Sequence, residues 1–293
     1  MALSFEELKK NRGKKALESL SSELKKLSPG VKEADERIWY PEVDKVGNGY
    51  AVIRFLPAPV GEVSPFIRVY NHSFKGPSGL WYIENSLTTI GQDDPVGNAN
   101  RQYWNSGTEA DKEKAKAQNR RSTFYSNILV IKDPAKPENE GKVFIFKYGV
   151  KIFDKIKAKT NPASSHDEPL NVFDLWEGNN LKVKIRQVAG FRNYDESEWE
   201  SSSAIANSEE KIQKIWEGAY PLKEFLDSKN YKTFDELKAH YEKVTGNSSG
   251  SDKPALKQES GPKLKEKASA KLYVSDSDTE DEADFLKRLT QDD

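Results

Sequence analysis

The sequence predicts an α+β protein whose β-rich core lies between two charged terminal segments. Apolar runs rich in β-branched and aromatic residues recur between residues 37 and 188, separated by Gly, Pro and Asn turn signals. Helical periodicity is confined to shorter segments, chiefly 4–28 and 208–246. Charged residues make up 32% of the 293-residue chain and apolar residues 35%, so part of the chain is predicted to be unfolded.

The first 30 residues predict a basic N-terminal arm. Residues 1–32 carry eight Lys or Arg against four Glu, a balance of +4, and leucines at 17, 20, 24 and 27 form one apolar stripe. Five cations cluster around Gly13, namely Lys9, Lys10, Arg12, Lys14 and Lys15. This segment is either an arm that docks on another molecule or subunit, or a basic helix that covers the core.

Three strands are expected between residues 37 and 90, at 50–56, 66–70 and 80–84. Alternation places Phe66, Arg68 and Tyr70 on one face of the second strand, so that face is aromatic and basic. Ordinary core packing or a half-buried sheet surface is the alternative reading of these aromatics. Residues 86–108 are expected to form a long loop or small subdomain, with Tyr103 and Trp104 as its core, and 109–121 a helix.

Residues 119–149 predict a strand, a Pro- and Gly-rich loop and a second strand. Arg120 and Arg121 open the segment, and Lys147 and Tyr148 lie near its other end. Cations mixed with aromatics on strands suit a surface that holds a charged backbone and stacks its bases. The buried side is expected to contain Ile128, Val130, Val143 and Ile145, and the stacking side Phe124, Tyr125 and Phe146. Strict alternation cannot place both Phe124 and Tyr125 on one face, so one of them is core or the strand is bulged.

Residues 151–157 predict a short amphipathic helix, and 181–186 a strictly alternating strand. Leu181, Val183 and Ile185 are expected to face the core. The other face of the strand carries a cationic row, Lys182, Lys184 and Arg186. Three like charges repel one another unless an anion relieves them, so this row is a candidate anion-binding surface or a solvated sheet face. Phe191, Arg192 and Tyr194 add two aromatics and a cation just beyond it.

The C-terminal part of the chain predicts helix, then linker, then acidic tail. Within 208–246, Thr233 and Glu236 fit a capping box, Gly246 a helix end, and Phe234, Leu237, Tyr241 and Val244 a buried stripe. Residues 247–272 are rich in Ser, Gly, Lys and Pro, which predicts a flexible linker. Residues 275–293 hold eight Asp or Glu against Lys287 and Arg288, a balance of −6, which predicts a disordered tail that binds partners.

Several classes of function lack their sequence signals. The chain has no cysteine, which excludes disulfides and cysteine-ligated metal sites. No apolar run approaches the ~20 residues of a membrane helix, and no secretory signal opens the chain, so we expect no membrane partner and a cytoplasmic location. His72, His166 and His240 are far apart, and neither a phosphate-binding glycine loop nor a nucleophile elbow occurs. We therefore expect no enzymatic activity.

What remains is a binding surface for single-stranded nucleic acid. Base–aromatic stacking tolerates any sequence, and a duplex hides its base faces. The residues predict a single-strand binder on a small barrel of the OB type, occupying residues 31–246. Two alternatives stay open: a non-catalytic protein-interaction scaffold whose aromatics are core, and a metal-dependent nuclease.

Seven motifs in this chain occur in the same order as in a known family of proteins. They are Gly-Asn-Gly-Tyr-Ala-Val-Ile-Arg-Phe-Leu-Pro (47–57), Asn-His-Ser-Phe-Lys (71–75), Trp-Tyr-Ile-Glu (81–84), Asn-Ile-Leu-Val-Ile-Lys-Asp-Pro (127–134), Pro-Glu-Asn-Glu-Gly-Lys-Val-Phe (137–144), Trp-Glu-Gly-Asn-Asn-Leu-Lys-Val-Lys (176–184) and Gly-Phe-Arg-Asn-Tyr-Asp-Glu-Ser (190–197). On these residues the chain resembles the single-stranded DNA-binding, helix-destabilising proteins of T-even-type bacteriophages and their cyanophage relatives. The resemblance covers roughly residues 45–205.

The resemblance implies an OB-fold core with a cleft for a few nucleotides of single-stranded DNA, in an infected bacterial host cell. It implies sequence-nonspecific, cooperative coating through the basic arm, which docks on the next protomer. It also implies that the acidic tail recruits phage replication, recombination and repair proteins. Carried over by position, the residues near the DNA cleft are Arg120, Arg121, Phe124, Tyr125, Phe146, Phe191 and Tyr194.

The resemblance also implies a metal, and here the chain departs from the family. The best-known member binds structural zinc through one histidine and three cysteines. His72 occupies the histidine position, whereas the cysteine positions fall near Ser86, Asp94 and Gly97, and glycine has no side-chain ligand. We therefore predict that the chain has no cofactor and has lost the family zinc site.

Overall fold

The computed structural model describes residues 35–164 and 168–246. The basic arm predicted at 1–30 and the linker and tail predicted at 247–293 lie outside the described residues. The chain divides into two units, Met1–Ile38 and Trp39–Asp293.

The described residues form an α+β fold, as the sequence predicts. The strands are β1 (Ile38–Trp39), β2 (Gly49–Phe55), β3 (Phe66–Lys75), β4 (Trp81–Asn85), β5 (Arg121–Lys132), β6 (Val143–Tyr148), β7 (Asn179–Val188), β8 (Phe191–Asn193) and β9 (Glu198–Ser202). The helices are α3 (Pro95–Ser106), α4 (Glu109–Ala117), α5 (Val150–Thr160), α6 (Glu209–Glu217) and α7 (Phe234–Thr245). Short 3-10 turns are η1 (Leu87–Ile90), η2 (Pro137–Asn139), η3 (Lys223–Leu226) and η4 (Ser228–Asn230).

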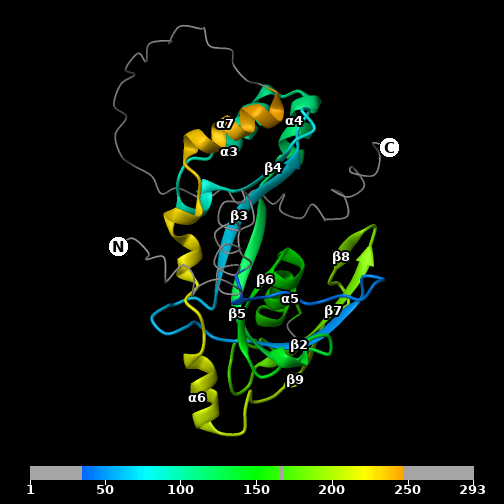
Figure 1. Ribbon diagram of the computed structural model, residues 1–293, viewed down its shortest axis with the longest axis vertical. Helices are drawn as coiled ribbons and strands as arrows, with labels where there is room; N and C mark the ends of the chain where they lie inside the picture. Colours follow the sequence, from blue (N-terminus) through cyan, green and yellow to red (C-terminus); the bar gives the residue numbers. More distant parts are fainter. Residues whose placement is uncertain (1–34, 165–167, 247–293) are drawn as a thin grey trace, which may run out of the picture. The chain divides into compact units, whose positions relative to one another are not determined.

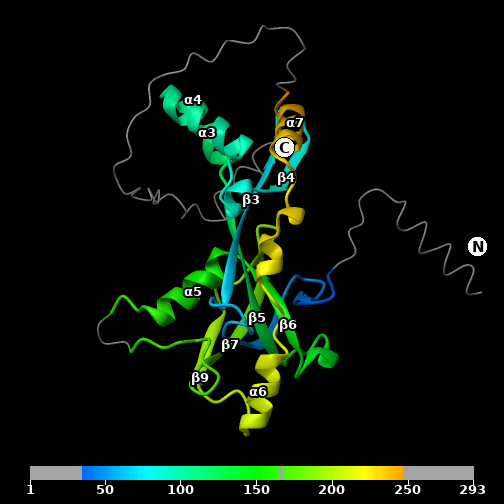
Figure 2. The same ribbon diagram turned by 90° about the vertical axis from the view of Figure 1, so that its left-hand side faces the viewer.

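Strand β5 connects two parts of the sheet. Its residues 128–132 pair antiparallel with β2, and its residues 121–126 pair antiparallel with β3. The main sheet has the order β6-β5-β2-β7-β8, and β9 also pairs with β7. Strands β3 and β4 form a ribbon that branches from β5, and Figures 1 and 2 show β3 and β5 side by side on the way to α3, α4 and α7.

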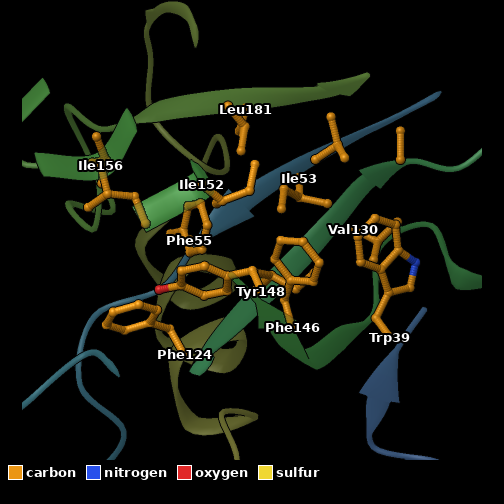
Figure 3. Close-up of a cluster of buried hydrophobic side chains, with 14 of the residues drawn as sticks. Trp39, Ile53, Phe55, Phe124, Val130, Phe146, Tyr148, Ile152, Ile156 and Leu181 are labelled. Carbon is orange, nitrogen blue, oxygen red and sulfur yellow. The ribbon is translucent and has the colours of Figure 1, made fainter. Parts of the chain in front are cut away.

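The β5–β6 hairpin is buried on both faces, which corrects the single buried side predicted for it. Ile128 pairs with Phe144 and Leu129 with Val143, so Ile128 and Val143 lie on opposite faces. One face belongs to the main core cluster shown in Figure 3, with Phe55 at its centre. The other face contacts a smaller cluster of Leu56, Leu129, Leu175 and Ile212, the last from α6.

The ends of β3 and β4 belong to a second core. The segment 86–108, expected to be a loop or small subdomain, contains η1 and helix α3, so it is mostly helical. Asp94 caps α3 by accepting hydrogen bonds from the N–H groups of Val96 and Gly97. The core contains Phe74, Tyr82, Leu87, Val96, Leu237, Tyr241 and Val244. Trp104 is 46% exposed, so its predicted core role is wrong.

The C-terminal helical segment follows its sequence signals closely. Helix α7 begins with the predicted capping box of Thr233 and Glu236 and ends at Gly246, which adopts φ 74°. Three of the four predicted inward residues are buried, but Phe234 is 37% exposed because it lies at the first turn, before the helix meets the β3–β4 ribbon. The predicted helix at 109–121 is confirmed as α4, and the one at 151–157 as α5.

The turn between β7 and β8 holds an alanine in a left-handed conformation, so a glycine there is expected to stabilise the protein slightly. Ala189 and Gly190 have φ values of 49° and 84°, and a left-handed alanine costs about 1 kcal/mol or more relative to its ordinary conformation. Because glycine adopts this conformation freely, Ala189→Gly is expected to raise the free energy of unfolding by about 0.5–1 kcal/mol in urea titrations. Gly190→Ala, in the same turn, is expected to lower it. Equal stability of the two variants would contradict the strained turn.

Candidate nucleic-acid interface

Three side chains on the β3–β5 ribbon form an arginine–tyrosine cluster, which we define as Arg68, Tyr70 and Arg120. Alternation along β3 brings Arg68 and Tyr70 to one face, and Tyr70 pairs across the ribbon with Ser122. Arg120 comes directly before β5. The guanidinium carbons of Arg68 and Arg120 lie 4.6 and 4.1 Å from the centre of the Tyr70 ring.

The arginine–tyrosine cluster carries two positive charges, one on each guanidinium group. Each guanidinium is attracted to the Tyr70 ring. Because both guanidinium carbons lie within 5 Å of the centre of the same ring, the two cations repel each other. Both arginines are exposed, and no carboxylate in the described part of the chain forms an ion pair with either. Guanidinium groups bind phosphates through strong, charge-assisted hydrogen bonds. The cluster is therefore suited to binding an anion such as a backbone phosphate.

The position of the cluster follows from the length of β3. Phe66, at one end of the strand, packs against the main core, and Phe74, near the other end, belongs to the second core. Arg68 and Tyr70 lie on the same face between them, where neither core covers the strand. The sequence predicts this alternation, but Arg68 and Tyr70 are not among the predicted site residues. The pattern aromatic–basic–aromatic at 66, 68 and 70 was the signal.

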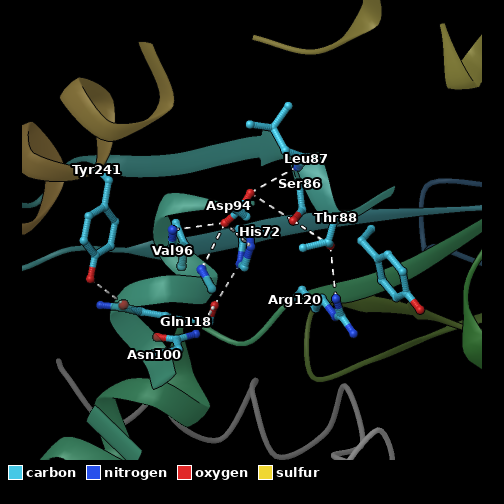
Figure 4. Close-up of polar contacts among 12 residues, drawn as sticks. His72, Ser86, Leu87, Thr88, Asp94, Val96, Asn100, Gln118, Arg120 and Tyr241 are labelled. Atoms are coloured by element: carbon cyan, nitrogen blue, oxygen red, sulfur yellow. Dashed lines mark hydrogen bonds and ion pairs between the residues drawn. The ribbon is translucent and has the colours of Figure 1, made fainter. Parts of the chain in front are cut away.

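A buried polar network lies next to the cluster, and Figure 4 shows it. Its centre is Asp94, which is 2% exposed. Oδ1 of Asp94 accepts hydrogen bonds from Val96 N and Gly97 N, each at 3.0 Å, and lies 3.2 Å from Nε2 of His72. Oδ2 accepts hydrogen bonds from Ser86 Oγ at 2.9 Å and Leu87 N at 3.2 Å.

This network occupies the four positions where the family resemblance implies zinc. Ser86 is a poor zinc ligand, Gly97 offers only a backbone N–H, and both Asp94 oxygens already accept hydrogen bonds. The donor set therefore does not fit a tetrahedral zinc site. Within residues 35–164 and 168–246, no group of three His, Cys, Asp or Glu side chains is placed to hold a metal ion.

The charge of Asp94 makes stability depend on pH. Burial raises the pKa of Asp94, but the contact with His72 and the hydrogen bonds from Gly97 and Ser86 outweigh burial and lower the pKa to about 2. A carboxylate with a lowered folded-state pKa stabilises the fold above its ordinary pKa of 3.8, and this contribution is lost as pH falls toward 2. The shift corresponds to roughly 2 kcal/mol.

Replacing Asp94 by asparagine is therefore expected to lower the free energy of unfolding at pH 7 by roughly 2 kcal/mol or more, because the amide cannot accept the same set of hydrogen bonds. The variant is also expected to lose less stability than the unmodified protein between pH 4 and pH 2. Urea unfolding followed by tryptophan fluorescence at several pH values measures both effects. The neighbouring Asp93 is exposed, so Asp93→Asn is the matched control. An unchanged pH dependence in Asp94→Asn would contradict the assignment.

Three of the predicted DNA-binding aromatics are core side chains. Phe146 and Phe124 are 1% and 3% exposed, and Phe124 stacks on Phe153 with ring centres 3.9 Å apart. Tyr148 is buried as well, its hydroxyl 2.9 Å from Ser126 Oγ, and burial raises the pKa of Tyr148. Figure 3 shows these rings packed among aliphatic residues. Because neither face of a buried ring is open to a base, the predicted DNA-binding role is corrected for all three side chains.

Tyr125, Lys147 and Arg121 lie on the opposite face of the ribbon from the arginine–tyrosine cluster. Tyr125 pairs with Lys147 across β5 and β6, and Arg121 pairs with Asn71 across β5 and β3. The Tyr125 ring stacks on Phe225, 4.6 Å between centres, and burial raises the pKa of Tyr125 to about 12. Of the predicted DNA-binding residues, only Arg120 therefore belongs to the arginine–tyrosine cluster.

The cationic row on β7 has the predicted alternation, but the fold supplies its counter-charges. Leu181, Val183 and Ile185 are buried. On the other face, each cation of the row approaches one glutamate: Lys182 lies 3.5 Å from Glu200, Lys184 2.8 Å from Glu198, and Arg186 3.0 Å from Glu196. The carboxylates that relieve the repulsion are thus part of this chain, and two of the three lie in β9. The row is a weaker candidate for phosphate binding than the arginine–tyrosine cluster.

The remaining predicted residues lie in and beside the β7–β8 hairpin. Phe191 is 40% exposed at its tip, and Arg192 donates a hydrogen bond of 3.2 Å to the carbonyl of Pro41. Tyr194 packs partly against the main core. Of the two rings, that of Phe191 is the more exposed. The self-association residues predicted at 9–15 lie outside the described residues. None of the helices in the described ranges is long and apolar enough to cross a membrane.

Comparison with known proteins agrees with a nucleic-acid interface. A family model described as gp32 DNA binding protein like matches residues 47–245. The chain is 36% identical over 279 residues to the single-stranded DNA-binding protein of Enterobacteria phage T2, covering 93% of this chain and 92% of that protein. It is also 36% identical over 278 residues to the single-stranded DNA-binding protein of Enterobacteria phage T4, with the same coverage. The chain therefore belongs to the family of gp32-like DNA-binding proteins.

Proposed function

We propose that this chain is a sequence-nonspecific single-stranded DNA-binding protein. The observation that carries the proposal is the arginine–tyrosine cluster, an exposed pair of guanidinium groups without a carboxylate partner in the described residues. Backbone phosphates are the anions that such a pair binds without regard to base sequence. The T2 and T4 relatives carry the name single-stranded DNA-binding protein.

Single strands are preferred over duplexes because their bases are available for stacking. Phe191 and Tyr50 are 40% and 38% exposed, so each ring has an accessible part. Base–aromatic stacking contributes about 1–3 kcal/mol per base and does not depend on sequence. We further propose that strands β2, β5, β6 and β7 form an OB-type barrel, supported by their antiparallel pairing around the main core.

The terminal segments supply the cooperative and partner-binding parts of this function. We propose that the basic arm at 1–30 docks on the next protomer along the DNA, supported by the balance of +4 over residues 1–32. The acidic tail within 247–293 recruits phage replication, recombination and repair proteins in the cytoplasm of the infected host, supported by its run of carboxylates. The core at 31–246 binds DNA and carries out no catalysis.

Binding of fluorescently labelled oligothymidylate, followed by anisotropy at two salt concentrations, tests the function. We expect tight binding that weakens steeply with salt, since each phosphate contact contributes about −0.7 to the log–log salt slope of a single strand. An unlabelled mixed-sequence single strand is expected to compete well, and a duplex poorly. Absence of binding at low salt would favour the protein-interaction scaffold. Degradation of the strand with magnesium or manganese would favour the nuclease.

A further inference from the structure

The buried network around Asp94 continues to Arg120 through two hydroxyl groups. Ser86 Oγ donates to Asp94 Oδ2 at 2.9 Å and lies 3.0 Å from Thr88 Oγ1. A serine hydroxyl has one proton, so Thr88 must donate to Ser86. The Thr88 oxygen then accepts the 3.1 Å hydrogen bond from Nη1 of Arg120. The chain of donors runs in one direction, from the arginine cation to the buried carboxylate.

A second route fixes the backbone just before Arg120. Nδ1 of His72 lies 2.9 Å from the carbonyl oxygen of Gln118, to which Asn100 Nδ2 also donates at 3.3 Å. The Gln118 side chain accepts a 2.9 Å hydrogen bond from the Tyr241 hydroxyl of α7. Gln118 is buried and stands two residues before Arg120. The network thus constrains both the guanidinium of Arg120 and the chain that carries it.

We propose that Asp94 and His72 are positioning residues that hold Arg120 over Tyr70 for phosphate binding, and that this hydrogen-bonded network takes the structural place of a metal ion. The proposal rests on the proposed function for its DNA-binding part. Asp94 supplies the negative charge at one end of the hydroxyl chain, and hydrogen bonds in such a chain polarise one another in a buried environment. His72 holds the Gln118 carbonyl, and Thr88 is the link that touches Arg120 itself.

The most direct test removes only the hydroxyl group of Thr88, which contacts Arg120. Thr88→Val deletes the acceptor for Arg120 together with the donor to Ser86, and it leaves the hydrogen bond from Ser86 to Asp94 and the second core in place. We expect about two- to tenfold weaker oligothymidylate binding, the effect of losing one hydrogen bond, and a smaller salt slope. Thr88→Ser keeps the hydroxyl and is expected to restore both values. Thr160→Val, at an exposed position at the end of α5, is the matched control.

A double-mutant cycle distinguishes positioning from simple structural support. If Thr88 acts through Arg120, the variant Thr88→Val with Arg120→Ala binds no more weakly than Arg120→Ala alone. Additive losses with an unchanged salt slope would overturn the positioning role. Asp94→Asn is expected to follow the same non-additive pattern. If the unmodified protein fails to bind oligothymidylate at all, the proposed function fails instead.

Metal content tests the structural part without DNA. The full chain, dialysed against a chelator, is expected to keep its thermal midpoint and to contain no stoichiometric zinc by elemental analysis. Asp94→Ala is expected to lower the thermal midpoint, and added zinc is expected not to restore it. A zinc equivalent in the purified chain, whose removal lowers the midpoint, would overturn the proposal.

Discussion

A protein in which both Arg68 and Arg120 are replaced by alanine is expected to bind oligothymidylate at least about 100-fold more weakly at moderate salt. Each charge-assisted hydrogen bond to a phosphate contributes about 1.5–3 kcal/mol, and 1.4 kcal/mol corresponds to a factor of ten. The log–log salt slope is expected to become shallower by about 1.4, because two phosphate contacts are lost. Anisotropy titrations across a salt series measure both quantities.

Folding is expected to survive this double substitution. Both side chains are exposed, and Arg120 contacts the rest of the described chain mainly through Thr88 and Tyr70. Lys214→Ala is a suitable control because Lys214 is exposed on α6, the helix that packs on the opposite face of the β5–β6 hairpin. Tyr70→Phe keeps the ring and is expected to bind normally, whereas Tyr70→Ala releases both guanidiniums. A double variant with unchanged affinity and slope would remove the arginine–tyrosine cluster from the interface.

Local signals in this sequence predicted local structure well. The capping box of Thr233 and Glu236 and the alternation of Leu181, Val183 and Ile185 depend on residues that are close in sequence, and both predictions are confirmed. The glutamates that pair with the cationic row on β7 come from residues 196–200, and their pairing depends on the register between β7 and β9. Alternation on a single strand cannot reveal such cross-strand partners.

The aromatic residues were harder to assign because a strand buried on both faces has no polar side. Phe124 and Phe146 face the main core, and Tyr125 packs on Phe225 from a different element. A sequence pattern shows which residues share a face, but not what covers that face. Residues 86–108 present the same difficulty, since the helix at Pro95–Ser106 is stabilised by the Asp94 cap and by packing on α7.

The core assignment of Phe146 leads to the largest expected effect on stability. Phe146 is 1% exposed, and its ring centre lies 5.2 Å from that of Trp39 and 5.3 Å from that of Tyr148. Truncating such a ring to alanine costs about 3–5 kcal/mol, through lost burial and the cavity that remains. This is a large part of the ~5–15 kcal/mol by which a typical domain is stable. Phe146→Ala is therefore expected to lower the midpoint of thermal unfolding by about 6–20 °C.

The matched variant is Phe191→Ala, which removes the same ring from the 40% exposed tip of the β7–β8 hairpin. It is expected to leave the thermal midpoint nearly unchanged, because little buried surface is lost. The two variants are therefore distinguished by two measurements. Phe146→Ala is expected to lower the thermal midpoint, and Phe191→Ala, if Phe191 stacks on a base, to weaken oligothymidylate binding by about 1–3 kcal/mol. A Phe146→Ala protein that unfolds normally and binds poorly would instead place Phe146 on the DNA-binding surface. That result would require the β5–β6 hairpin to expose the face that is buried against Phe55 and Trp39.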